Sequence, residues 1–307
     1  MPVTRSQRRN RSGASGRSDL TVEERFRKMF GTKLSKLFLA VYLFVRYPWD
    51  SPGRLTAMRD IKQKRVKDEA IKIQFGGTYL EYGLNRALGA VEPVCLLWAI
   101  KDWRDFAVEY QTSQPMDQEV DTVMPAKYRE VEEILQYKFT NKSLLMMALC
   151  PVGGLRPVGS TLERLEFLGD AVLDVIALDF LRCQDPEDSK VGPRLQLSVS
   201  NKALQAICLE TGLFRFIRVY CEDVALEDSI TAAKASWEAA KQGFPAVAPW
   251  KQQHLCKTLA DVVEALFGAV FLDCEMDMVR VGKVFDEIHW PVIGRRLAPV
   301  DAWRGLA

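Results

Sequence analysis

Carboxylates at helical spacing are the residues of this chain best suited to chemistry. Glu163, Glu166, Asp170 and Asp174 stand at relative positions 0, 3, 7 and 11, so one face of an α-helix would gather them into a stripe. A solvated acidic face normally interleaves Lys or Arg, yet only Arg164 is near, on a neighbouring face. Like charges placed in this way need a cation, which favours a metal-binding helix.

A second segment, 257–269, repeats the pattern with Asp261 and Glu264 three residues apart among apolar residues. If the two helices cross, their acids converge into a set of oxygen ligands that suits Mg²⁺, with Mn²⁺ as a substitute. One ion could generate the hydroxide that attacks a phosphodiester, and another could stabilise the leaving oxygen. Spacing alone also fits two ordinary amphipathic helices with solvated charged faces.

Helical periodicity dominates the chain, and no stretch alternates as a strand does, so we expect an all-α fold. Between 22 and 110 the periodicity is broken by the prolines and glycine of 48–53. Gly212 fits a helix C-cap, 111–126 has the polar composition of a linker, and 218–253 reads as a surface excursion. The second half predicts helices at 128–139, 142–149, 163–181, 194–211 and 259–272.

Composition indicates a globular protein of one or two domains, with 307 residues of which 48% are hydrophobic. Seven cysteines without a CxxC pair, and no apolar signal segment, indicate reduced thiols in an intracellular protein, cytoplasmic or nuclear. The apolar stretch 37–45 is too short to cross a bilayer, so we expect no membrane association. His254 and His289 fall in no motif, which argues against a histidine-rich metal site.

Charge is distributed unevenly along the chain. Residues 1–75 hold 18 Lys and Arg against 7 Asp and Glu, which suits a polyanionic partner. Within them, 1–20 is rich in Arg, Ser and Gly and predicts a disordered basic tail. A nucleic-acid-binding or nuclear-targeting arm is an alternative, and a mitochondrial presequence is disfavoured because its apolar face would be poor.

Four segments together resemble the ribonuclease III family. Residues 163–174, Glu-Arg-Leu-Glu-Phe-Leu-Gly-Asp-Ala-Val-Leu-Asp, resemble the family signature, and 257–269 resemble its second motif. Residues 128–144 resemble its opening helices, and Val199-Ser-Asn-Lys-Ala-Leu its middle one. The likeness covers roughly 128–290 and implies a ribonuclease III endonuclease fold over 127–296, followed by a tail at 297–307.

The resemblance also implies roles for individual residues, while Asp174 is interpreted as a satisfied helix-face residue. The family usually carries His-Pro-Ser after its second helix, whereas this chain has Leu149-Cys-Pro-Val-Gly153, so we expect weaker substrate contact there. The implied metal ligands and catalytic residues are Glu166, Asp170, Asp261 and Glu264, with Glu163, Lys257 and Asn201 as auxiliary residues.

Residues 21–110 resemble a truncated, degenerate copy of the same fold, similar to the first ribonuclease domain of Dicer-type proteins. In the register that aligns Phe75 with Phe267, Glu69 matches Asp261 and Lys72 matches Glu264. Residues 24–32 separately resemble a damaged signature, in which Thr32 stands where the signature has Asp170. A cation and a hydroxyl cannot replace two anionic ligands, so this copy should not cleave. Decay without any function is the alternative.

The resemblance implies a Mg²⁺-dependent endoribonuclease of RNA processing or silencing that cleaves double-stranded RNA recognised by its A-form shape. Region 127–296 would pair with 21–110 inside the chain, with a second copy as a homodimer, or with a Dicer-type partner. Few residues follow Ala298, so we expect no double-stranded-RNA-binding domain there and weak, salt-dependent affinity. The alternative is a weak or inactive RNA-binding member, either a regulatory pseudo-Dicer or a mitochondrial ribosome-associated protein.

Overall fold

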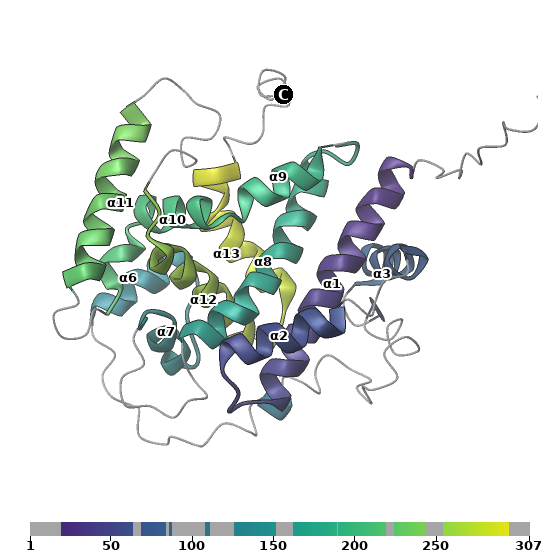
Figure 1. Cartoon of the computed structure of the whole chain (residues 1–307), viewed down its shortest axis with the longest axis horizontal. Helices are drawn as coiled ribbons and strands as arrows, with labels where there is room; N and C mark the ends of the chain where they lie inside the picture. The colour runs from purple at the N-terminus through teal and green to yellow at the C-terminus, as the bar shows by residue number, and fades with distance from the viewer. Residues whose placement is uncertain are drawn as a thin grey trace, which may run out of the picture.

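The computed structural model describes residues 20–63, 69–83, 86–87, 108–110, 126–151, 162–188, 190–218, 224–242 and 254–294. Every regular element in these ranges is helical, so the expected all-α fold is confirmed (Figure 1). None of the described helices combines the length and apolarity needed to cross a membrane. Most of the tail predicted at 1–20, most of the linker predicted at 111–126 and the tail predicted at 297–307 lie outside the described residues.

Two crossed helices form the centre of the fold: α8 (Leu162–Gln184) and α12 (Lys257–Asp273). Their backbones touch because a glycine of each helix faces the other. A Cβ atom on Gly169 would lie 1.8 Å from the carbonyl oxygen of Glu264, and one on Gly268 would lie 2.3 Å from that of Leu165. Only glycine permits so close an approach, so this pair of residues fixes where the helices cross.

The N-terminal unit consists of α1 (Val22–Arg46), α2 (Pro52–Gln63) and α3 (Glu69–Tyr82). Thr21 and Glu24 form a capping box that starts α1, and the turn predicted at 48–53 separates α1 from α2. α1 packs along α8, and their buried apolar residues belong to one continuous core (Figure 1). The two units are therefore not physically separate in the described chain.

The crossing of α1 and α3 uses the same device as the crossing of α8 and α12. A Cβ atom on Gly31 would lie 2.0 Å from the carbonyl oxygen of Lys72, and one on Gly76 would lie 1.8 Å from that of Arg27. In both helix pairs, each glycine meets the residue four positions before the partner's glycine. The geometry thus matches Lys72 with Glu264, the register in which the two sequence segments align.

Further helices surround the α8–α12 pair. The predicted helix 194–211 is broken, because the Ser200 side chain accepts a hydrogen bond from the Ala203 amide and caps a new helix. Gly212 has φ +76°, as expected for a residue that ends a helix. The surrounding elements are α6 (Ala126–Leu135), α7 (Lys142–Ala148), α9 (Val191–Ser198), α10 (Asn201–Glu210), the 3₁₀ turn η1 (Leu213–Phe216), α11 (Val224–Gln242), α13 (Met278–Ile288) and the π-helical turn η3 (Trp290–Gly294).

Two sequence predictions about this shell were wrong. The predicted excursion 218–253 contains α11, whose Trp237 is 1% exposed and donates its indole N–H to Glu210 on α10. Ala233 is also buried, and Leu226 and Ile230 pack against the core, so α11 has an apolar face that the sequence analysis did not recognise. The helix expected at 128–139 ends at Leu135, because Gln136 adopts φ +48°.

We predict that Gly76→Ala will destabilise the protein strongly, whereas Gly282→Ala will not. The added methyl group at position 76 would overlap the α1 backbone and force the helices apart, at a cost of about 3 kcal/mol. Gly282 lies on α13 with open space around it, so alanine there should stabilise by up to about 1 kcal/mol. Guanidinium unfolding followed by circular dichroism measures both changes. Equal stabilities would contradict the crossing of α1 and α3.

Candidate metal centre and the groove around it

Three carboxylates from the crossed helices converge. Glu166 of α8 and Asp261 and Glu264 of α12 each offer an oxygen atom, and these atoms all lie within 4.8 Å of one another. The convergence follows from the glycine contact, since Glu264 is the very residue whose backbone meets Gly169. Three of the four predicted ligands are therefore close enough to share one ion.

Burial makes this cluster electrostatically unfavourable on its own. The Glu264 side chain belongs to a residue that is 8% exposed, and burial together with the charges of Asp170, Glu166 and Asp261 raises its pKa well above the usual value. Burial likewise raises the pKa of Glu166 and of Asp261. Within the described chain Glu264 forms no ion pair. An all-oxygen, anionic set of this kind fits a hard divalent cation.

Lys257 supplies the one protein cation that touches the cluster in the described chain. Its Nζ atom lies 2.9 Å from Glu166 Oε1 and 2.6 Å from Asp261 Oδ1. Burial alone would lower the pKa of Lys257, but the hydrogen bonds to these two carboxylates outweigh it and raise the pKa. The side chain is 58% exposed, so it is free to move aside when an ion approaches.

Asp170, the fourth predicted ligand, is engaged elsewhere. Lys36 of α1 lies with its Nζ 2.8 Å from Asp170 Oδ1, and Arg59 of α2 lies with its Nη1 3.3 Å from Oδ2. Burial would raise the pKa of Asp170, but these two cations outweigh it and hold the pKa below its usual value. Asp170 therefore differs from the other three carboxylates, because its partners are cations of the N-terminal unit.

The cluster opens into a groove of about 450 Å³ whose two walls come from different units. One wall is α2, and the other is formed by α8, α12 and the start of α10. The auxiliary residues expected from the sequence all face this groove. Its lining includes Pro52, Gly53, Thr56 and Arg59 on the first wall and Glu163, Glu166, Phe167, Asp170, Asn201, Lys257 and Glu264 on the second.

Sequence reasoning missed the cations of the N-terminal unit that face α8. Lys36 and Lys33 both bind Asp174, at 2.5 Å and 2.8 Å, so the expected satisfied role of Asp174 has its partner across the units. Lys28 forms an ion pair with Glu69. In the glycine register, Lys28 matches Glu166 and Glu69 matches Asp261, so an internal ion pair occupies the place of two ligands. The register set by the glycines could have indicated this ion pair from the sequence.

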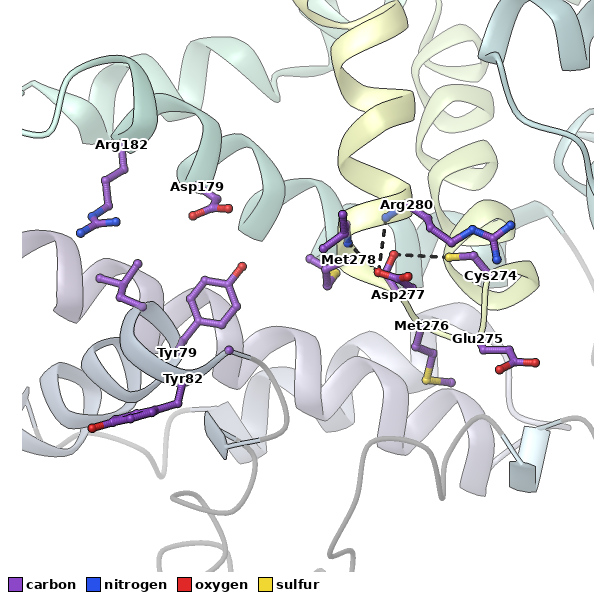
Figure 2. A pocket seen from close by; sticks show the side chains of 13 residues that line it. Tyr79, Tyr82, Asp179, Arg182, Cys274, Glu275, Met276, Asp277, Met278 and Arg280 are labelled. Carbon is purple, nitrogen blue, oxygen red and sulfur yellow. Dashed lines mark hydrogen bonds between the residues drawn. The ribbon is translucent and has the colours of Figure 1, made fainter.

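A second hollow, of about 720 Å³, lies between α3, the C-terminal half of α8 and the turn from α12 to α13. Figure 2 shows Tyr79 and Asp179 on one side of it and Asp277 with Arg280 on the other. Asp277 accepts hydrogen bonds from backbone amides at the start of α13, so it serves as a helix cap. The acids here do not converge as those of the first groove do, which leaves the first groove as the candidate site.

Comparison with known proteins agrees with this site. The sequence model of the ribonuclease III domain matches residues 163–275, which include both acidic helices. Dicer-like protein 1 of Neosartorya fischeri is 32% identical over 60% of this chain and 12% of its own length. Ribonuclease 3-like protein 2 of Arabidopsis thaliana is 30% identical over 53% of this chain and 41% of its own length. Protein Dicer of Schizosaccharomyces pombe is 27% identical over 72% of this chain and 16% of its own length.

The chain thus spans well under half the length of these relatives. The similarity to the S. pombe protein covers more of the chain than region 127–296 contains, so it reaches into the sequence before that region. The all-helical architecture, the two acidic helices and these matches agree with one another. The chain therefore carries a ribonuclease III domain over residues 163–275, and it is similar to Dicer-type proteins.

Proposed function

We propose that this chain is a Mg²⁺-dependent endoribonuclease that cleaves double-stranded RNA in RNA processing or silencing, with Mn²⁺ able to substitute. The observation that carries the proposal is the convergence of Glu166, Asp261 and Glu264 within 4.8 Å, beside a groove that Glu166 and Glu264 line. We infer the reaction from the similarity to the ribonuclease III family, and the residues from the geometry of the cluster. We also propose an intracellular location, cytoplasmic or nuclear, because the seven cysteines form no CxxC pair.

The three carboxylates would hold the ion. When bound there, a divalent ion would supply activation of water and neutralisation of the charge that develops on the phosphodiester. Glu264 is the most deeply buried of the three, and it lines the groove together with Glu166. Lys257 is placed to shift from Glu166 and Asp261 to a phosphate oxygen when the ion is present.

The remaining groove residues would position the backbone of the duplex. Lys257 and Arg59 give the groove cations on both walls, which suits a chain of phosphates. Asn201 offers an amide at the N-terminus of α10, where backbone N–H groups also favour anions. Recognition by phosphates and 2′-hydroxyls would be insensitive to sequence.

The N-terminal unit would act as a built-in partner of the catalytic unit and would be a degenerate copy of it. The shared glycine crossing of α1–α3 and α8–α12 supports common descent. Arg164 of α8 supports tight pairing, because its buried guanidinium donates hydrogen bonds to the carbonyl oxygens of Phe44, Tyr47 and Asp50 at the end of α1. The Lys28–Glu69 ion pair explains why such a copy would need no metal.

A second candidate function is RNA binding with little or no cleavage, as in a regulatory pseudo-Dicer. One observation favours it: Asp170, which the family signature would assign to the metal, is neutralised by Lys36 and Arg59. The three-carboxylate cluster favours catalysis, and a direct assay distinguishes the two.

We predict that the wild-type chain will cut long duplex RNA in Mg²⁺ and that Asp261→Asn and Glu264→Gln will each reduce the rate at least about 100-fold. Each substitution removes a charged ligand from the ion, which supplies several kcal/mol of transition-state stabilisation. Gel analysis of end-labelled duplex measures the rate. Glu287→Gln, at an exposed position on α13, is the matched control and should cut as fast as wild type.

The same samples decide between the two candidate functions. If the wild-type chain retards the duplex in a native gel but leaves it as intact as the Asp261→Asn variant does, RNA binding without catalysis replaces the proposal. Chelation of divalent ions should abolish cutting by the wild-type chain, and addition of Mn²⁺ should restore it.

We predict that the full chain is a monomer of 34.8 kDa, since α1 already covers the face of α8 that a second copy would need.

We also predict that Arg164→Met will lower the free energy of unfolding by about 3 kcal/mol, because three carbonyl oxygens lose a charged donor. Arg280→Met, at an exposed position, is the control and should have little effect. Light scattering and guanidinium unfolding give the two readouts. A homodimer would contradict the built-in partner.

A further inference from the structure

A buried glutamine holds the short segment that leads into α12. Gln205 of α10 is fully buried, and its side-chain amide binds two backbone groups of residues 254–256. Its Nε2 atom donates to the carbonyl oxygen of His254 at 2.6 Å, and its Oε1 atom accepts from the amide of Cys256 at 2.6 Å. This one side chain therefore holds both a carbonyl group and an N–H group of the segment 254–256.

The helix α12 begins without a capping side chain of its own. Cys256 is the N-cap residue, and in the described structure its side chain forms no hydrogen bond to the first turn. A helix start without such a bond frays more readily. Fraying would move Lys257, the first residue of α12, and Asp261, one turn later. The hydrogen bonds of Gln205 oppose this movement, because they tie the N-cap residue to the core.

α11 holds the same segment through a second contact. The Oγ atom of Ser236 accepts a hydrogen bond from the amide of His254 at 2.8 Å. The next residue, Trp237, is buried and donates its indole N–H to Glu210 at the end of α10, which keeps α11 packed against α10. His254 is therefore bound to α10 through its carbonyl group and to α11 through its amide.

α10 reaches the candidate site in two places. Asn201, its first residue, lines the groove, and Gln205 lies four residues later on the same face of the helix. The segment 254–256 is followed directly by Lys257, whose Nζ atom lies 2.9 Å from Glu166 and 2.6 Å from Asp261. A side chain that contacts carboxylates of two different helices depends on where its own backbone lies. The place of the segment 254–256 thus affects the centre of the site.

We propose that Gln205 is a positioning residue for hydrolysis, and that it acts by fixing where Lys257 and Asp261 stand at the start of α12. The inference rests on the proposed function, because it assumes that the phosphodiester is cut in this groove. Methionine fills a similar volume but can form neither hydrogen bond of the amide. Gln205→Met therefore separates the positioning role from simple filling of the core.

Two measurements on Gln205→Met in the full chain test the proposal. Amide hydrogen exchange of residues 254–260, followed by mass spectrometry, needs neither metal nor RNA and should be about tenfold faster than in wild type. In cleavage of duplex RNA, kcat should fall at least about tenfold while KM changes less than about twofold, because the groups that react are displaced and the wider groove still binds the duplex.

Thr211→Val is the matched control for Gln205→Met. Thr211 lies at the other end of α10, and its hydroxyl group also donates a hydrogen bond to a backbone carbonyl oxygen, that of Ile207. This variant loses a hydrogen bond of the same helix far from the start of α12. Exchange of residues 254–260 and kcat should both equal the wild-type values.

Ser236→Ala gives an answer even if Gln205→Met does not fold, because it removes one hydrogen bond from a half-buried side chain on α11. Exchange of residues 254–260 should rise and kcat should fall, each by about threefold. Faster exchange with unchanged kcat, or unchanged exchange, would overturn the inference and leave the proposed hydrolase intact. A wild-type chain that does not cut duplex RNA would overturn both.

Discussion

The contact between the backbones of α8 and α12 is the constraint on which the other features depend. Gly169 and Gly268 allow the helices to touch, and that contact brings one turn of each helix into register. Acids that are distant in the sequence then meet within 4.8 Å. A methyl group at either glycine would separate the helices and the acids together, so the fold and the candidate site share one determinant.

Lysine and arginine side chains of the protein itself neutralise several of its carboxylates. Lys28 pairs with Glu69 where the second unit has ligand positions, and Lys36 with Arg59 neutralises Asp170. The cluster of Glu166, Asp261 and Glu264 keeps surplus negative charge, because Lys257 is the one cation that pairs with it among the described residues. The positions of lysine and arginine, as well as those of the carboxylates, thus determine where negative charge remains that an ion could neutralise.

Sequence analysis predicted the features that depend on local pattern and missed those that depend on contacts between units. The spacing of residues close together in the sequence predicts the acidic stripe of α8, the all-helical fold and the Gly212 cap. Asp170 and Lys36 are far apart in the sequence, so no periodic pattern of residues could predict their ion pair. The helix α11 was missed although Ala233 and Trp237 are buried, because the contacts of these residues with the rest of the fold could not be read from the sequence.

Lys257 has a consequence for the order in which the protein is assembled. Its ammonium joins a carboxylate of α8 to one of α12, so it ties the two central helices together without any ion. The helix pair is therefore not left with three uncompensated charges during folding. The packing of these two helices would therefore not depend on an ion, unlike that of small domains that acquire their structure only on binding metal.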